Sequence, residues 1–158
     1  MDNVLLRYYR QRKFYETIDW LEDWRWEWIG HMTLDKNYND EVINKKLLRW
    51  VRKLQTREHM QIAYMGILCR KKGHPHVHLL MLGRGNADNR VKTLLSVDSS
   101  FWGKQWPVFA KVERINNWER AIRYISTHVF RSKCDEYELI DYNQKLLHRC
   151  SMRRGFVA

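Results

Sequence analysis

The sequence predicts an α+β fold in which a central antiparallel β-sheet is flanked by helices, in a single domain covering residues 1–158. Segments of strand and helix periodicity follow one another in the order helix, strand, helix, hairpin, helix, strand, helix. The composition, 44% apolar and 30% charged, is that of a globular chain. We expect helices over one face of the sheet, which would leave the other face free to carry a site.

The first third of the chain predicts a strand between two helices. Residues 3–22 combine Leu, Tyr and charged side chains and predict a helix. Residues 24–34 alternate tryptophans with charged residues, which is the period of a strand. Asn39 is a candidate N-cap for a helix over about 40–57, where apolar residues recur at helical spacing.

The middle of the chain predicts a hairpin followed by a helix. Residues 60–70 and 75–83 are mainly apolar runs separated by a short turn, which is typical of two strands paired in a hairpin. A polar loop that contains glycines follows. We expect a helix to start at about residue 88.

The last third predicts one more strand and one more helix. Residues 107–113 have the composition of a strand. Asn116 is the expected cap of a helix over about 117–131, with Glu119 in capping-box position. The basic tail at about 132–158 receives no element.

Charge and composition restrict the class of partner. The net charge is +11, from 29 Lys and Arg against 18 Asp and Glu, which favours nucleic acid. Eight tryptophans and eight tyrosines offer stacking surfaces for unpaired bases, although most of them are expected in the core. Three unclustered cysteines argue against a disulfide framework. Without a secretion-signal pattern or an apolar run of roughly 20 residues, we expect a cytoplasmic protein and no membrane partner.

The most informative segment is Gly73-His74-Pro75-His76-Val77-His78, which four apolar residues follow. Side chains on a strand alternate between its faces, so His76 and His78 point the same way. They are roughly 6.7 Å apart along the strand, a gap that inclined imidazoles can bridge to one metal ion. The alternative is that both histidines satisfy hydrogen bonds in the core. His74 is a weaker candidate ligand, because Pro75 disfavours regular strand pairing there.

The last expected helix carries a candidate nucleophile. Its apolar residues, at positions 118, 121, 122, 125 and 129, form a core stripe of helical period. Tyr124 and His128 lie four residues apart and therefore on one face, at the border of that stripe. Arg120 and Arg131 continue the border. Taken alone, the pattern also fits a tyrosine at the rim of the core beside solvated arginines.

Together, these motifs resemble those of the HUH endonucleases, and especially the rolling-circle replication initiators of plasmids and single-stranded DNA viruses. His76-Val77-His78 and its flanks, GHPHVHLL, are similar to the histidine–hydrophobe–histidine segment that names the family. Residues 28–34 resemble the family's first motif, and residues 124–127 its tyrosine motif. The resemblance covers roughly residues 26–131. It implies the ferredoxin- or RRM-like sheet of the HUH fold and a DNA endonuclease activity.

The chain departs from the family pattern after the tyrosine. The initiators usually carry Lys three residues after the tyrosine, where this chain has Thr127. That lysine is thought to position the phosphate or activate the tyrosine. Arg120, Arg123 or Lys133 could take its place.

A second departure concerns the third metal ligand. The initiators often have a carboxylate before the first histidine, where this chain has Leu68, which cannot bind a metal. His128 is the expected replacement, because related single-tyrosine transposases place a ligand four residues after the tyrosine. Cys69 is a weaker candidate: it should face away from Leu68, and a thiolate suits softer metals.

The resemblance implies a nicking and joining reaction. Tyr124 would attack a DNA phosphodiester, giving a 5′-phosphotyrosine and a free 3′-OH, with Mn²⁺ or Mg²⁺ on His76, His78 and His128. The substrate would be single-stranded DNA at a replication origin, including a hairpin. The side chains expected to hold the DNA backbone are basic: Arg120, Arg123, Arg131, Lys133, Lys71 and Lys72.

The motifs also bear on partners. No P-loop motif occurs, so a separate helicase would have to unwind the DNA. With a single tyrosine in the motif, a second cleavage would need a second subunit in a homodimer, a water molecule or another tyrosine.

Two other interpretations stay open at this point. One is a single-tyrosine transposase or a relaxase of the same superfamily, and the spacing of Tyr124 and His128 favours the transposase. A non-catalytic nucleic-acid-binding protein would bind DNA without any metal-dependent cut.

Overall fold

The computed structural model describes residues 11–12, 15–16, 18–69, 75–130 and 137–141, with side chains up to residue 127. Six strands in this part of the chain form one sheet, in the order β5-β1-β3-β2-β6, and β4 pairs with β3 off this path. All the pairs are antiparallel. The structure thus confirms an α+β fold around a central antiparallel sheet.

The elements follow one another along the chain much as the sequence predicts. In order they are β1 (Trp28–Thr33), α2 (Asp40–Glu58), β2 (Met60–Cys69), β3 (His76–Ala87), β4 (Arg90–Lys92), the short 3-10 helix η1 (Leu94–Ser96), α3 (Ser99–Lys104), β5 (Phe109–Arg114), α4 (Trp118–Phe130) and β6 (Tyr137–Asp141). The described residues between 11 and 22 are helical, as expected for the N-terminal segment. No helix in the described part of the chain has both the length and the apolar character needed to cross a membrane.

Helix α2 forms where its sequence signals place it. The Asn39 side chain accepts a hydrogen bond from the backbone N–H of Val42 at 2.9 Å, which confirms the predicted cap. His59 ends the helix in the left-handed conformation with φ 51°. The apolar stripe of α2 is buried against the sheet, through Ile43, Leu47, Trp50, Val51 and Leu54.

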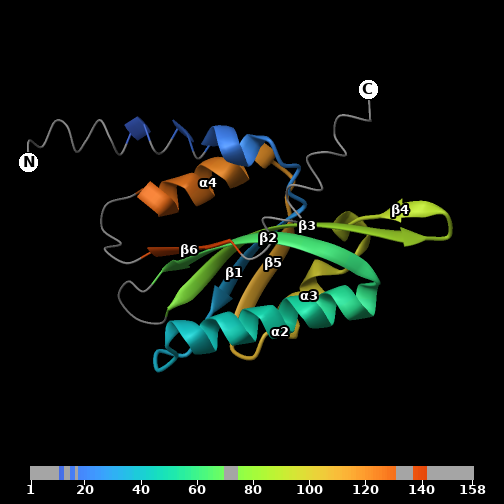
Figure 1. Ribbon diagram of the computed structural model, residues 1–158, viewed down its shortest axis with the longest axis horizontal. Coiled ribbons are helices and arrows are strands. Elements are labelled where there is room, and N and C mark those ends of the chain that lie inside the picture. The colour runs from blue at the N-terminus through green and yellow to red at the C-terminus, as the bar shows by residue number, and fades with distance from the viewer. Residues whose placement is uncertain (1–10, 13–14, 17, 70–74, 131–136, 142–158) are drawn as a thin grey trace, which may run out of the picture.

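Helices cover both faces of the sheet, so the expectation of helices on one face only is wrong. Helices α2 and α3 lie on one side, and α4 and the N-terminal helical residues lie on the other (Figure 1). Each side has its own core, one with Leu47 of α2 and Trp102 of α3 and the other with Ile122 of α4 and Leu21. Because strand side chains alternate between faces, each strand contributes to both cores.

The predicted helix start at about residue 88 is also wrong, since the helix of this region, α3, begins at Ser99. Strand β3 continues through the supposed loop to Ala87 and turns into β4 at Asp88 and Asn89, whose φ angles are 48° and 62°. Asp and Asn tolerate this left-handed backbone better than other non-glycine residues. Gly85 permits the pairing with β2, because a Cβ there would lie 2.6 Å from the carbonyl oxygen of His59.

Other element boundaries differ from the predictions as well. Strand β1 begins at Trp28 rather than residue 24, and Trp24 and Trp26 are instead buried in the core on the α4 side. The cap of α4 is Asn117 rather than Asn116, since its side-chain oxygen accepts a hydrogen bond from the backbone N–H of Arg120 at 2.9 Å. The tail, which received no element, contains β6.

The tryptophans are core residues, as expected for most of the aromatic side chains. Six of the eight are buried: Trp24, Trp26, Trp28, Trp50, Trp102 and Trp106. Trp20 and Trp118 are partly buried. The tryptophans therefore contribute mainly to the two cores.

Candidate metal and tyrosine site

The two histidines of the H-x-H motif lie on the face of the sheet that α4 covers. On β3, Val77 and Leu79 belong to the core on the α2 side, whereas Leu80 belongs to the core on the α4 side. His76 and His78 share the parity of Leu80 and therefore face α4. The prediction that they point the same way is confirmed.

A third histidine joins them from the neighbouring strand. Strand β1 runs antiparallel to β3, with His31 opposite His78 and Thr33 opposite His76. Residues directly opposite in an antiparallel pair have their side chains on the same face. His31 therefore stands beside His78, in a position that sequence reasoning did not assign to the site.

The three imidazoles are close enough to bind one ion. One ligand nitrogen from each of His31, His76 and His78 lies within 4.8 Å of the others. The ring centroids are 4.7 Å apart for His31 and His76, 5.0 Å for His31 and His78, and 4.8 Å for His76 and His78. His78 is only 2% exposed, and the other two are half-buried. The strands thus hold three candidate metal ligands close to one another.

The chemistry of the donors fits a divalent transition-type ion. Imidazole nitrogen suits Zn²⁺, Cu²⁺, Ni²⁺, Fe²⁺ and, when oxygen ligands complete the shell, Mn²⁺. Ions such as Ca²⁺ prefer oxygen donors, and this cluster of described residues contains no carboxylate.

Tyr124 stands against this cluster. Helix α4 is anchored on the sheet by Ile122 and Ile125, both buried, and this packing places Tyr124 at the border between core and solvent with 45% of its surface exposed. Its ring meets the ring of His78 edge-on, with centroids 5.5 Å apart and planes at 79°. The helix and the strand that carry the two motifs therefore bring the phenol next to the imidazoles.

The surroundings of Tyr124 disfavour ionisation of its hydroxyl. Burial raises the pKa of Tyr124 above its ordinary value, and the nearby Cys69 acts in the same direction through its charge when ionised. A phenolate at this position would need a compensating positive charge. A cation on the neighbouring histidines would supply that charge.

Cys69 and Leu68, neighbours on β2, point to opposite faces of the sheet. Cys69 lies opposite His76 in the β2–β3 pairing and belongs to the core on the α4 side, whereas Leu68 belongs to the core on the α2 side. This confirms that Cys69 faces away from Leu68. The sulfur of Cys69 is nevertheless outside the group of three close ligand atoms.

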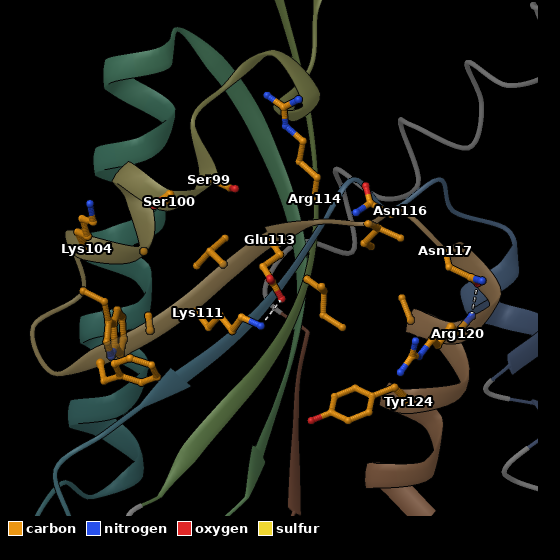
Figure 2. Close-up of a pocket in the computed structure, with 18 of the residues that line it drawn as sticks. Ser99, Ser100, Lys104, Lys111, Glu113, Arg114, Asn116, Asn117, Arg120 and Tyr124 are labelled. Atoms are coloured by element: carbon orange, nitrogen blue, oxygen red, sulfur yellow. Dashed lines mark hydrogen bonds and ion pairs between the residues drawn. The ribbon is translucent and has the colours of Figure 1, made fainter.

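A groove leads away from the tyrosine. It has a volume of about 1000 Å³, follows the outer edge of β5 from α3 to the start of α4, and is lined by Tyr124 and Arg120 at its α4 end. Figure 2 shows the Tyr124 ring extending from α4 toward the sheet, with Arg120 beside it on the same helix. Arg123 is exposed but is not part of the lining.

Several predicted site residues lie outside what the structure describes. His74, Arg131, Lys133, Lys71 and Lys72 fall in segments that are not described, and the side chain of His128 is not described. The role of His128 as third ligand therefore stays a prediction, beside the described alternative His31.

Comparison with known proteins returned no match to a family model, a curated protein or a solved structure.

His31 was missed because it stands alone in its segment. A signal was present, since Ile29 and His31 alternate with Trp28 and Met32 across the two faces of β1. The sequence alone, however, does not say that β1 lies next to β3 or which residues are opposite one another.

Proposed function

We propose that the chain is a metal-dependent single-strand DNA endonuclease of the HUH class that cuts with Tyr124 and initiates rolling-circle replication. The observation that carries the proposal is the contact of the Tyr124 ring with His78, inside a cluster of three histidines. Packing at the rim of a core does not by itself explain three imidazoles beside this tyrosine. A nucleophile for a phosphodiester does need a cation there.

In the proposed reaction, one phosphate ester is exchanged for another. The oxygen of Tyr124 attacks the phosphorus, its proton leaves to solvent, and a bond from oxygen to phosphorus forms. The bond from phosphorus to the 3′ oxygen breaks, and that oxygen takes up a proton to become a free 3′-OH. One ester bond has formed for the one that broke, so the same step in reverse can rejoin strands without an external energy source.

The histidines would hold a divalent ion, and this ion would supply Lewis-acid polarisation of a phosphate oxygen. The three imidazole donors favour Mn²⁺ over Mg²⁺, because Mg²⁺ prefers an all-oxygen shell. The remaining ligands would be oxygen atoms of the phosphate or of water.

The position of Tyr124 suits single-stranded DNA as the substrate. The phenol is half-exposed and lies where the groove along β5 ends, so a flexible single strand can bring its backbone to it. The proposal includes a separate helicase as partner, since the chain carries no P-loop motif.

Nicking of origin DNA tests the proposal. The protein is incubated with labelled single-stranded origin DNA and Mn²⁺, and products are resolved on a denaturing gel. We expect cleavage by the wild-type protein, and no cleavage by a His76→Ala, His78→Ala double variant that still binds DNA. A wild-type protein that binds the DNA tightly and leaves it intact with Mn²⁺, Mg²⁺ and Zn²⁺ would indicate a non-catalytic nucleic-acid-binding protein instead.

A further inference from the structure

We propose that Phe109 and Lys111, on the edge strand β5, form the platform that holds the substrate strand next to the histidine cluster: Phe109 stacks on a base and Lys111 binds a backbone phosphate. This inference rests on the proposed function, because it assigns the path of the same DNA strand. Neither residue was a candidate in the sequence.

The strand register places both side chains on the face of the site. Lys111 is opposite His31, which is opposite His78, so these three form one row across the sheet. Phe109 is opposite Thr33, which is opposite His76, and this is the next row. Since paired residues share a face, Phe109 and Lys111 point to the same side as the histidines.

The spacing matches the reach of a single strand. Neighbouring strands lie about 4.8 Å apart, so Lys111 stands one strand from His31 and two from His78. Phe109 and Lys111 are two positions apart on β5, which is about 6.7 Å along the strand. A phosphate on Lys111 and a base on Phe109 can therefore belong to nucleotides close to a phosphate at the histidines.

The apolar side chain of Phe109 is exposed to solvent rather than packed in a core. It is 61% exposed, and three aromatic residues are among the exposed large hydrophobic side chains of the described chain: Tyr15, Phe109 and Tyr124. The tryptophans are unavailable, because they pack in the two cores. Phe109 and Tyr124 both line the groove along β5, so the groove carries two exposed aromatic side chains. Such side chains stack on bases irrespective of sequence.

The charge of the groove fits a polyanion. Among its lining residues four are cationic and one is anionic, namely Lys104, Lys111, Arg114 and Arg120 against Glu113. Lys111 is 65% exposed and pairs with Glu113 at 3.0 Å. Exposed pairs of this kind contribute little to stability, so Lys111 can exchange its partner for a phosphate. Figure 2 shows this pair on β5, with the Tyr124 ring extending toward the sheet from α4.

This placement offers a substitute for the missing family lysine. The resemblance implies a lysine three residues after the tyrosine, and the chain has Thr127 there. Lys111 lies on β5 in the same row as His31 and His78, on the face of the sheet that α4 covers. It is a positioning residue in this account, since it acts on a phosphate beside the one that reacts.

The test measures DNA binding apart from cleavage. Affinity for a labelled oligothymidylate of about 15 nucleotides is followed by fluorescence anisotropy in EDTA, with the full-length chain. Phe109→Ala is compared with Val91→Ala, a change of an equally exposed apolar residue on β4. Lys111→Gln is compared with Lys45→Gln, since Lys45 is equally exposed and also pairs with a carboxylate, but on α2.

We expect Phe109→Ala to weaken binding about tenfold, as loss of one stacked base would. Lys111→Gln should reduce the slope of log affinity against log salt by about 0.7, the value for one phosphate contact on a single strand. The two control variants should bind as the wild-type protein does. Equal affinity of all four variants, or a wild-type protein that binds duplex of the same length as tightly, would overturn the platform.

The outcome also separates this inference from the proposed function. If Phe109→Ala and Lys111→Gln lose DNA binding while the wild-type protein cuts no DNA, the platform stands and the nuclease proposal fails. If the wild-type protein cuts DNA while Phe109→Ala and Lys111→Gln bind DNA as the wild-type protein does, the platform fails and the nuclease proposal stands.

Discussion

Replacement of His31 tests the part of the site that only the structure revealed. His31→Ala removes one of three imidazoles whose ligand atoms lie within 4.8 Å of one another. Removing a residue that hydrogen-bonds to a metal ligand typically lowers the affinity for the metal about 10–100-fold. Removing a ligand itself should lower the affinity at least that much. We therefore expect a loss of about 2–3 kcal/mol in Mn²⁺ binding.

The affinity is measured by titration with Mn²⁺, with free ion counted by electron paramagnetic resonance. His59→Asn is the matched control, because it removes an exposed imidazole outside the site. Asn also tolerates the left-handed backbone at this position. The reasoning would be refuted by a His31→Ala protein that binds Mn²⁺ as tightly as His59→Asn does. A loss with His128→Ala instead would then assign the third ligand to α4.

Three further predictions concern stability and ionisation. In the metal-free protein, the pKa of Tyr124 should exceed its ordinary value of about 10, and it should fall when Mn²⁺ is added. A pH titration followed by phenolate absorbance measures it, as the component that is absent from Tyr124→Phe. A midpoint for this component below the ordinary pKa of tyrosine would contradict the burial argument. Burial raises the pKa of Glu58, but hydrogen bonds from Lys92 and Trp102 and the charges of Lys92 and Arg57 outweigh it, so the pKa is lowered. The ionised Glu58 therefore stabilises the fold at neutral pH, and this stabilisation is lost as the pH falls through its folded pKa. Glu58→Gln should lower the free energy of unfolding by about 1–2 kcal/mol at pH 7 and by less in acid, as urea titrations at both pH values would show. Gly85→Ala should cost about 1–3 kcal/mol through backbone crowding, a loss visible in the same urea titration.

The elements with strong local signals could be predicted from the sequence. The capped helix α2, the hairpin of β2 and β3 and the amphipathic α4 all depend on neighbours within a few residues, and their predicted type is correct. The shared face of His76 and His78 is equally local, because it follows from the two-residue period of one strand.

Features that depend on distant pairing could not be predicted. The two glycines in residues 83–85 look like a loop in sequence, but they sit in β3 where neighbouring groups approach too closely for a Cβ. His31 and Lys111 enter the site only because β1 and β5 lie beside β3 in a particular register. No local pattern contains that register.

The expectation of a bare sheet face failed for a related reason. The N-terminal helical residues and α4 were both predicted, but their packing on the same face, opposite α2, depends on chain crossings between distant elements (Figure 1). This arrangement matters for function, because α4 brings Tyr124 to the histidines only by covering the face that carries them.

The most direct measurement of the proposed activity asks whether a residue becomes joined to DNA, and which one. Wild-type protein is incubated with Mn²⁺ and a single-stranded origin oligonucleotide, the adduct is digested, and the modified peptide is sequenced by mass spectrometry. The account predicts a phosphodiester on Tyr124, absent from Tyr124→Phe and retained in Tyr15→Phe, whose tyrosine is also exposed. An adduct on any other residue, or one that persists in Tyr124→Phe, would contradict it.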